Sequence, residues 1–358
     1  MTLRCGLRLL VILAGLSGCR QKVETISDST DVTRNSSRYA KLIDVPQDRI
    51  FVAGEGIEVI DAAAGQVVGG INWETEISEI LFTQNGLRGF AASSSGVFEF
   101  DPHKLVLRNI LTNKKAVSIR LAQDDDKIFI LESISSGKKA EKSKEHLRLS
   151  VFDLADNTFL RTEPLPKGVI DFIPSDNPAQ FSFFKFDTGS IAITKGLKTK
   201  DLRTIPQILA RSSFVRSRVE SSILFVESAE NSSLVKVNMK TGQLERVFTS
   251  PEANFSNLIQ SNDGQRLLLA GPQSSLILQW SEFELIRTLK NNLVRVPAAF
   301  SIDRRRLYYL RMGDEQKNLV SALLIDRDKH QGDIPTKVIR ARVIAVHPRS
   351  EYAALQRP

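Results

Sequence analysis

Few residues of this 358-residue chain have the types and spacing that chemistry requires. A metal site needs several converging Cys, His or carboxylate ligands, and no such cluster is visible, so the sequence predicts neither a metal nor a cofactor. No Gly-x-Ser-x-Gly turn indicates a serine nucleophile. Gly54-Glu55-Gly56 lacks the strand and helix that flank a nucleotide-binding loop and is simpler as a hairpin turn. The sequence therefore predicts no catalytic residue. The scattered candidates are Cys5, Cys19, His103, His146, His330 and His347.

Cys19 is the exception, because its surroundings suggest a reaction of its thiol. Arg4 and Arg8 precede an uncharged, mostly apolar run over residues 9–18. This order is typical of a secretory signal peptide, and the run is shorter than the roughly 20 residues of a membrane span. It ends in Leu16-Ser17-Gly18-Cys19, which resembles the lipobox of bacterial lipoproteins. The resemblance implies cleavage between Gly18 and Cys19 and a diacylglyceryl group on the Cys19 thiol; the alternative is an ordinary signal with an incidental cysteine.

The lipobox divides the chain into three parts. Residues 1–18 are the expected signal peptide, residues 19–38 a lipidated N-terminus with a polar tether, and residues 39–358 the folded domain. The protein is thus expected to be exported and held at a membrane by its N-terminal lipid. Arg20, where an Asp would mark inner-membrane retention, favours the outer membrane or periplasmic face in a Gram-negative cell.

The net charge of +8 is spread along the chain rather than concentrated in one segment. Lys and Arg alternate with Asp and Glu, aromatic residues are only 7%, and no nucleic-acid-binding motif is present. These features argue against a nucleic-acid partner. They leave an envelope protein or polysaccharide as the expected partner.

From about residue 40 the chain is a repeat of short β-strands. A strand ending in an acid or amide before a tight turn recurs at Asp61, Asp101, Asp153, Asn238 and Asp326, with weaker copies near Lys195 and Ser281. Most of these marks lie 40–45 residues apart, and the one longer interval contains the charged segment 135–145. Earlier hairpin turns recur in phase, as at Asn85-Gly86 and Asp263-Gly264, where glycine supplies the positive φ of a two-residue hairpin.

Together the two marks resemble the YVTN-type and WD-repeat-like β-propellers. The resemblance covers about residues 40–356 and implies an all-β fold with four antiparallel strands per blade. Seven marks predict a seven-bladed β-propeller, with an eight-bladed ring as the alternative. If the fold is not a propeller, the alternatives are a β-sandwich array and another β-solenoid. We expect residues 342–347 and 351–355 to close the ring by completing the blade that begins at residues 49–53.

In a propeller the first strand of each blade lines a central channel. Seven charged residues fall on the expected inner strands: Glu76, Glu79, Arg120, Asp171, Arg216, Arg218 and Arg342. Some YVTN-type relatives are lactonases, but no catalytic motif can be transferred to this chain. The sequence therefore favours a membrane-tethered, non-catalytic protein- or ligand-binding module at the cell envelope. The alternatives are a lactonase-like or other channel-centred hydrolase, and a structural or ligand-sensing envelope protein.

Overall fold

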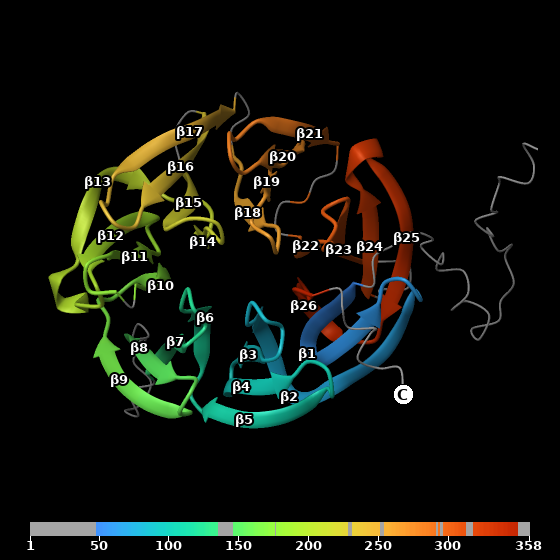
Figure 1. The fold of residues 1–358 in the computed structure, drawn as a ribbon, viewed down its shortest axis with the longest axis horizontal. Coiled ribbons are helices and arrows are strands. Elements are labelled where there is room, and N and C mark those ends of the chain that lie inside the picture. The colour runs from blue at the N-terminus through green and yellow to red at the C-terminus, as the bar shows by residue number, and fades with distance from the viewer. Residues whose placement is uncertain are drawn as a thin grey trace, which may run out of the picture.

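The computed structural model describes residues 48–134, 146–175, 177–227, 231–250, 254–290, 293, 296–312 and 318–349. The predicted signal peptide, Cys19, the tether and residues 351–355 lie outside these residues. Apart from two 3-10 turns, Thr199–Asp201 and Ile325–Arg327, the regular elements described are all β-strands. The sheets stand around a common axis and form a ring (Figure 1). The all-β prediction is confirmed.

The strands form six antiparallel sheets. The largest contains, in spatial order, β26 (Ile339–Val346), β1 (Arg49–Asp61), β2 (Gln66–Phe82), β3 (Gly89–Ser93), β4 (Gly96–Asp101) and β5 (Val106–Thr112). The next two are β6 (Ala116–Leu121), β7 (Lys127–Ile134), β8 (His146–Asp153), β9 (Thr158–Pro164), and β10 (Val169–Ile173), β11 (Phe181–Phe186), β12 (Ser190–Lys195), β13 (Arg203–Leu209). The last three are β14 (Val215–Arg216), β15 (Ser222–Glu227), β16 (Ser232–Asn238), β17 (Leu244–Ser250); β18 (Asn257–Gln260), β19 (Arg266–Ala270), β20 (Ser275–Gln279), β21 (Leu285–Leu289); and β22 (Ala298–Phe300), β23 (Arg306–Met312), β24 (Asn318–Leu324), β25 (Lys329–Thr336).

The prediction of seven four-stranded blades, with eight as the alternative, is wrong. The propeller has six sheets, five of four strands and one of six. The cause is β2, which runs unbroken for 17 residues. Its residues 66–71 and Glu76 pair with β1, and its residues 77–82 pair with β3. Two units that the repeat spacing separates therefore share one strand and become one sheet.

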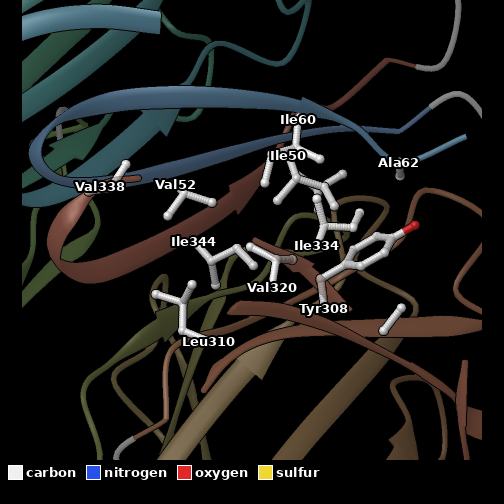
Figure 2. Packing of buried hydrophobic residues seen from close by; sticks show 12 residues of the cluster. Ile50, Val52, Ile60, Ala62, Tyr308, Leu310, Val320, Ile334, Val338 and Ile344 are labelled. Atoms are coloured by element: carbon white, nitrogen blue, oxygen red, sulfur yellow. The ribbon is translucent and has the colours of Figure 1, made fainter. Parts of the chain in front are cut away.

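The expected closure of the ring by the C-terminal segment is confirmed for residues 342–347. Strand β26 pairs with β1 over residues 343–346, with Ile50 opposite Val346 and Ala53 opposite Val343. The side chains of β1 and β26 pack with those of the last sheet, as Figure 2 shows for Ile50, Val52, Tyr308 and Ile344. The four residues are at most 7% exposed. Apolar burial at this seam therefore holds β1 and β26 against the last sheet, with a gain of about 25 cal/mol per Å² removed from water.

The recurring acid or amide at the end of a strand accepts hydrogen bonds from the backbone of the turn that follows it. Oδ1 of Asp101 accepts the backbone N–H groups of His103 and Lys104 at 2.9 and 3.0 Å. Oδ1 of Asn238 accepts those of Lys240 and Thr241 at 2.8 and 3.2 Å. Such side-chain bonds replace backbone partners that a turn lacks, which explains why Asp and Asn mark the repeat.

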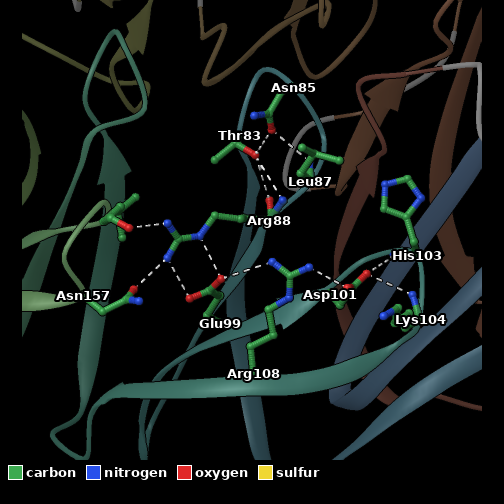
Figure 3. A network of polar contacts seen from close by, with 11 residues as sticks. Thr83, Asn85, Leu87, Arg88, Glu99, Asp101, His103, Lys104, Arg108 and Asn157 are labelled. Carbon is green, nitrogen blue, oxygen red and sulfur yellow. Dashed lines mark hydrogen bonds and ion pairs between the residues drawn. The ribbon is translucent and has the colours of Figure 1, made fainter.

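Arg88 fastens the six-stranded sheet to the neighbouring sheet, as Figure 3 shows. Its guanidinium donates to both oxygens of the buried Glu99, each at 2.8 Å, and to Oδ1 of Asn157 at 3.0 Å. A further N–H reaches the Leu154 carbonyl in the same turn as Asn157. Bidentate bonds between a guanidinium and a carboxylate fix geometry as well as charge, so this contact sets the relative position of the two sheets.

Candidate functional site in the central channel

A cavity of about 620 Å³ occupies the centre of the ring. Residues of seven strands and of the turns after them line its wall: the strands are β2, β6, β10, β14, β18, β22 and β26. The six-stranded sheet contributes two of these, β26 and the second half of β2, and each other sheet contributes its first strand. A cavity of this size is within the roughly 300–1,000 Å³ of small-molecule sites.

A repeated backbone hydrogen bond sets the level of six of the seven inner strands along the channel, β10 being the exception. The residue after the strand donates its N–H to the carbonyl of the residue that begins the next strand or lies just before it. Examples are Thr83 to Arg88, at 3.1 Å, and Ser217 to Ser222, at 2.9 Å. The remaining bonds of this kind are Ala122 to Lys127, Ser261 to Arg266, Ser301 to Arg306 and His347 to Arg49. Residues that stand the same number of positions before or after these donors in the sequence therefore lie at the same level of the channel.

Two levels of the channel differ in character. Two residues before each donor, the wall is apolar except at Arg120; the apolar members are Leu81, Val215, Ile259, Ala299 and Ala345. We call these five residues the apolar girdle. One residue after the donor, the wall is mostly polar, with Gln84, Gln123, Arg218, Asn262 and Pro348. We call these five residues, with Arg216, Gln260 and Asp125, the channel mouth.

The structure brings three of the predicted channel residues into one network. Nη1 of Arg120 pairs with Oε1 of Glu79, and Nη2 pairs with Oδ1 of Asp171 at 2.7 Å. Burial lowers the pKa of the Arg120 guanidinium, but the two carboxylates outweigh burial and hold that pKa above its ordinary value. The network therefore keeps a permanent cation between two acids and ties β2, β6 and β10 together.

The second oxygen of each acid is also occupied. Oε2 of Glu79 accepts the Ser118 hydroxyl at 3.0 Å and the Ile119 N–H at 2.9 Å. Oδ2 of Asp171 accepts the Phe214 N–H at 3.0 Å. Both carboxylates thus make hydrogen bonds that hold adjacent inner strands in register.

The other four predicted residues lie in two places. Nε of Arg342 pairs with Oε1 of Glu76 at 2.6 Å, and neither residue is among those described as lining the cavity. Arg216 and Arg218 lie at the channel mouth. There Arg216 donates to Pro174 and Arg218 donates to Asn262, neither of which belongs to the Glu79–Arg120–Asp171 network. The seven residues therefore form no single constellation.

Arg218 is exposed to the channel but surrounded by protein. Its Nη1 donates to the Asn262 carbonyl at 3.1 Å. Burial lowers the pKa of the Arg218 guanidinium, and the more distant charges of Asp125 and Asp263 oppose this effect. Arg216, two residues earlier, donates to Oε1 of Gln123 at 3.4 Å and to the Pro174 carbonyl at 3.5 Å. Both guanidinium groups lie at the mouth of the channel.

Sequence reasoning did not identify the amides of the mouth, Gln84, Gln123, Gln260 and Asn262, as channel residues. Three of them stand in or beside hairpin turns that the repeat had already marked, so their position in the repeat was the available signal. It also missed Lys185, which is 8% exposed and donates from Nζ to the Ser212 carbonyl at 3.0 Å. Burial lowers the pKa of this amine.

The histidines do not assemble a site among the described residues. His330 is exposed on β25, and its Nε2 lies 2.8 Å from Oδ1 of Asp333 on the same strand. His347 is fully buried near the start of β3, with Nε2 2.8 Å from the Gly86 carbonyl, and burial lowers its pKa to about 4. Within the described ranges, no group of three His, Cys, Asp or Glu residues is arranged to hold a metal ion.

The ring of radial sheets around a central channel defines the chain as a β-propeller. No known family matches the sequence, and no curated protein does. Solved structures resemble it in fold at low sequence identity. A functionally unknown protein from Desulfotomaculum acetoxidans aligns with a TM-score of 0.64 at 10% identity, over 85% of this chain and 100% of that one.

Two further structures show the same likeness. The Kuenenia stuttgartiensis hydrazine synthase aligns with a TM-score of 0.56 and 12% identity, over 83% of this chain and 97% of that one. The β-propeller domain of Cps50 (Swd1) from Myceliophthora thermophila gives 0.53 and 11%, over 72% and 85%. At these identities the likeness concerns the fold alone.

In the part of the chain that is described, no helix has the length and apolar character to span a membrane.

Proposed function

We propose that this chain is a membrane-tethered β-propeller lipoprotein that binds a ligand or partner at the cell envelope without converting it chemically. The observation that carries this proposal is the state of the channel acids. Glu79 and Asp171 each have both carboxylate oxygens engaged by Arg120, a hydroxyl or backbone N–H groups. They serve as structural ties between inner strands.

A hydrolase would need a different arrangement at the same place. A general base must be within hydrogen-bonding reach of the proton that it removes, and a nucleophile must lie beside such a base. For Glu79 to accept a proton at Oε2, it would have to give up its bonds to Ser118 and Ile119. Catalysis by this acid would therefore disturb the contact between β2 and β6, whereas ligand binding at the mouth leaves it intact.

The proposed tether comes from the lipobox at residues 16–19. Two or more acyl chains make a stable anchor, whereas one chain holds a protein only marginally. Cys19→Ala should abolish labelling of the protein by a fatty-acid analogue and release it from membranes into the soluble fraction. Equal membrane retention of the variant and the wild type would refute the lipid anchor while leaving the channel proposal standing.

Binding at the mouth can be tested in native membranes by site-specific photo-crosslinking of the full chain. A photoreactive residue replaces Gln123 at the mouth or, as the matched control, Arg161 on the exposed face of β9. We expect adducts of one defined mass from position 123 and none of that mass from position 161. The same adducts from both positions would contradict a site at the channel.

The opposing function is tested with the purified protein. It is screened against lactone and ester substrates beside the variants Glu79→Gln and Arg218→Gln. Under our proposal no substrate is turned over. Turnover by the wild type that disappears in both variants would replace the binding function by an enzymatic one.

A further inference from the structure

A second cavity lies in the outer wall of the ring and shares no lining residue with the channel. Its volume is about 470 Å³, which is within the range of small-molecule sites. Its wall comes from β5 and the residues just after it, and from β7, β8 and β9 of the neighbouring sheet. Strands β5 and β9 follow one another around the outside of the ring (Figure 1). We call this cavity, between β5 and the strands β7 to β9, the outer cleft.

Arg148 presents to the outer cleft a guanidinium that protein contacts occupy only in part. Its Nε donates to Oε2 of Glu132 at 2.6 Å. Glu132 is 1% exposed, and its carboxylate also accepts the hydroxyl groups of Thr112 and Ser150 at 2.6 and 2.7 Å. Within the described part of the chain, neither Nη1 nor Nη2 of Arg148 has a hydrogen-bond partner. Arg148 is therefore held in place at Nε, while its two outer nitrogens can bind a ligand.

A similar pair in another sheet shows that this arrangement is specific to the outer cleft. Arg246 on β17 donates from Nε and Nη2 to the two oxygens of the buried Glu227, at 2.7 and 2.9 Å. Glu227 thus uses two nitrogens of its arginine, whereas Glu132 uses one, since two hydroxyl groups also bond to Glu132. The outer pair of nitrogens stays unoccupied only on Arg148 of these two arginines.

The other end of the outer cleft is aromatic. The rings of Phe152 and Phe159 meet edge to face with centroids 5.4 Å apart. Phe159 is 55% exposed, so much of its ring is open to a ligand. Arg148 and Phe152 are four residues apart on β8, which is about 13 Å. Between them the wall carries the hydroxyl groups of Ser150 and Thr162, which stand opposite each other in the sheet.

We infer that the outer cleft binds an acidic sugar unit of a polysaccharide, with a uronic acid carboxylate at Arg148 and a neighbouring sugar ring against Phe159. The outer pair of guanidinium nitrogens matches the two oxygens of a carboxylate, and the exposed Lys114 adds a second cation to the wall. The hydroxyl groups of Ser150 and Thr162 can bond to sugar hydroxyls. The apolar C–H face of a sugar ring can cover the aromatic ring. The inference concerns a second site and goes beyond the proposed function.

Other carboxylates match the wall less completely. An alkyl tail that ran from Arg148 towards Phe159 would cover the hydroxyl groups of Ser150 and Thr162 without bonding to them. Covering a polar group without giving it a hydrogen bond costs free energy. An acidic peptide could supply the carboxylate, but its acidic side chains offer no ring face to Phe159. A sugar acid satisfies both ends of the outer cleft and its middle.

The test is isothermal titration calorimetry on the full chain in nanodiscs of zwitterionic lipid, with empty nanodiscs as the blank. The probe is trigalacturonate, and its trimethyl ester is the neutral analogue. Octanoate tests an acid with an alkyl tail, and tetraglutamate tests an acidic peptide. We expect one trigalacturonate per chain. We expect the ester, octanoate and tetraglutamate each to bind at least about tenfold more weakly.

The variants identify the residues. Arg148→Gln should weaken trigalacturonate binding about tenfold or more, and Arg148→Lys should give a smaller loss because the charge remains without the fork. The matched control is Arg246→Gln, which also removes an arginine from a buried glutamate and should leave binding unchanged. Phe159→Ala should weaken the acid and its ester alike, by about fivefold. Melting curves identify any variant that has unfolded, and Phe159→Ala changes an exposed side chain, so it keeps the test valid if Arg148→Gln unfolds.

Five results would overturn the inference. They are no binding of trigalacturonate, equal affinity for the acid and its ester, and binding of octanoate or tetraglutamate as tight as that of trigalacturonate. The other two are full affinity in a folded Arg148→Gln protein and an equal loss of affinity in Arg148→Gln and Arg246→Gln. Because the outer cleft shares no lining residue with the channel, each of these results leaves the proposed function standing. Turnover of a lactone or ester would refute the proposed function and leave the outer cleft unaffected.

Discussion

Asp48 allows a quantitative test of how the ring is closed. It is fully buried, and its Oδ1 accepts the Ile302 N–H at 3.1 Å while its Oδ2 accepts the Tyr308 hydroxyl at 2.9 Å. Its carbonyl also accepts the Ala62 N–H at 3.0 Å. One residue immediately before β1 thus connects the first and last sheets. Burial raises the pKa of this carboxyl to about 6, although its two hydrogen bonds act in the opposite direction.

The sign of the pH effect follows from the raised pKa. The folded protein binds the Asp48 proton more tightly than the unfolded chain does, so ionisation of Asp48 favours unfolding. Its contribution to the free energy of unfolding is complete below about pH 4 and is lost as the pH rises to about 6. Raising the pKa of the Asp48 carboxyl from 3.8 to about 6 corresponds to about 3 kcal/mol.

We expect Asp48→Asn, which stays neutral, to remove this dependence. The free energy of unfolding of the variant minus that of the wild type should rise by about 2 kcal/mol between pH 4 and pH 7, because the unfolded carboxyl is already partly ionised at pH 4. The difference is needed because His347 acts in the opposite direction. Burial lowers its pKa to about 4, so its contribution is lost as the pH falls from 6.5 towards 4.

The measurement is urea denaturation at pH 4, 5, 6 and 7, with Asp101→Asn as the control. Asp101 is also buried, and burial raises its pKa, but hydrogen bonds from Lys104, His103 and Arg108 outweigh burial and lower it below 3.8. Its contribution therefore changes only at acid pH, and the Asp101→Asn difference should be flat from pH 5 to 7. A flat Asp48→Asn difference over the same range would refute the reasoning about the seam.

Two other predictions concern the ring. Arg120→Met should lower the free energy of unfolding by about 3–5 kcal/mol, because Glu79 and Asp171 then face each other without the cation between them; Arg161→Met, exposed on β9, should change it by less than about 0.5 kcal/mol. A similar loss in both variants would show that the network does not hold the inner strands. Truncation after Arg340 removes the part of β26 that pairs with β1 and exposes the edge of β1, so the melting temperature should fall and the transition broaden. An unchanged melting curve would mean that β26 is dispensable.

The all-β class could be predicted from the sequence because it depends on local rules. Alternating apolar residues specify half-buried strands, and an Asp or Asn after a strand specifies a turn that its own side chain stabilises. The bonds of Asp101 and Asn238 to their turns show that rule acting within two or three residues. The pairing of residues 343–346 with residues 50–53 was also predictable, since a strand at each end of a repeat lacks a partner.

The number of sheets could not be predicted, because it depends on the course of β2. The repeat marks at Asp61 and Asp101 assign the segment between them to two successive units. Whether residues 72–76, which lie in that segment, turn or stay extended depends on how β1, β3 and the inner strands pack around them. They stay extended, so one strand belongs to both pairings and the ring has six sheets.

The sequence by itself determined that seven charged residues lie on or beside inner strands. It did not determine their partners. Only the ring places Arg120 between Glu79 and Asp171, residues 41 and 51 positions away, and sets Arg342 against Glu76. The same ring leaves Arg216 and Arg218 at the mouth, across from the apolar strands β22 and β26. The physical reason is that the interaction energy of two charges depends on the distance between them in space. In a closed ring the packing of the sheets sets that distance.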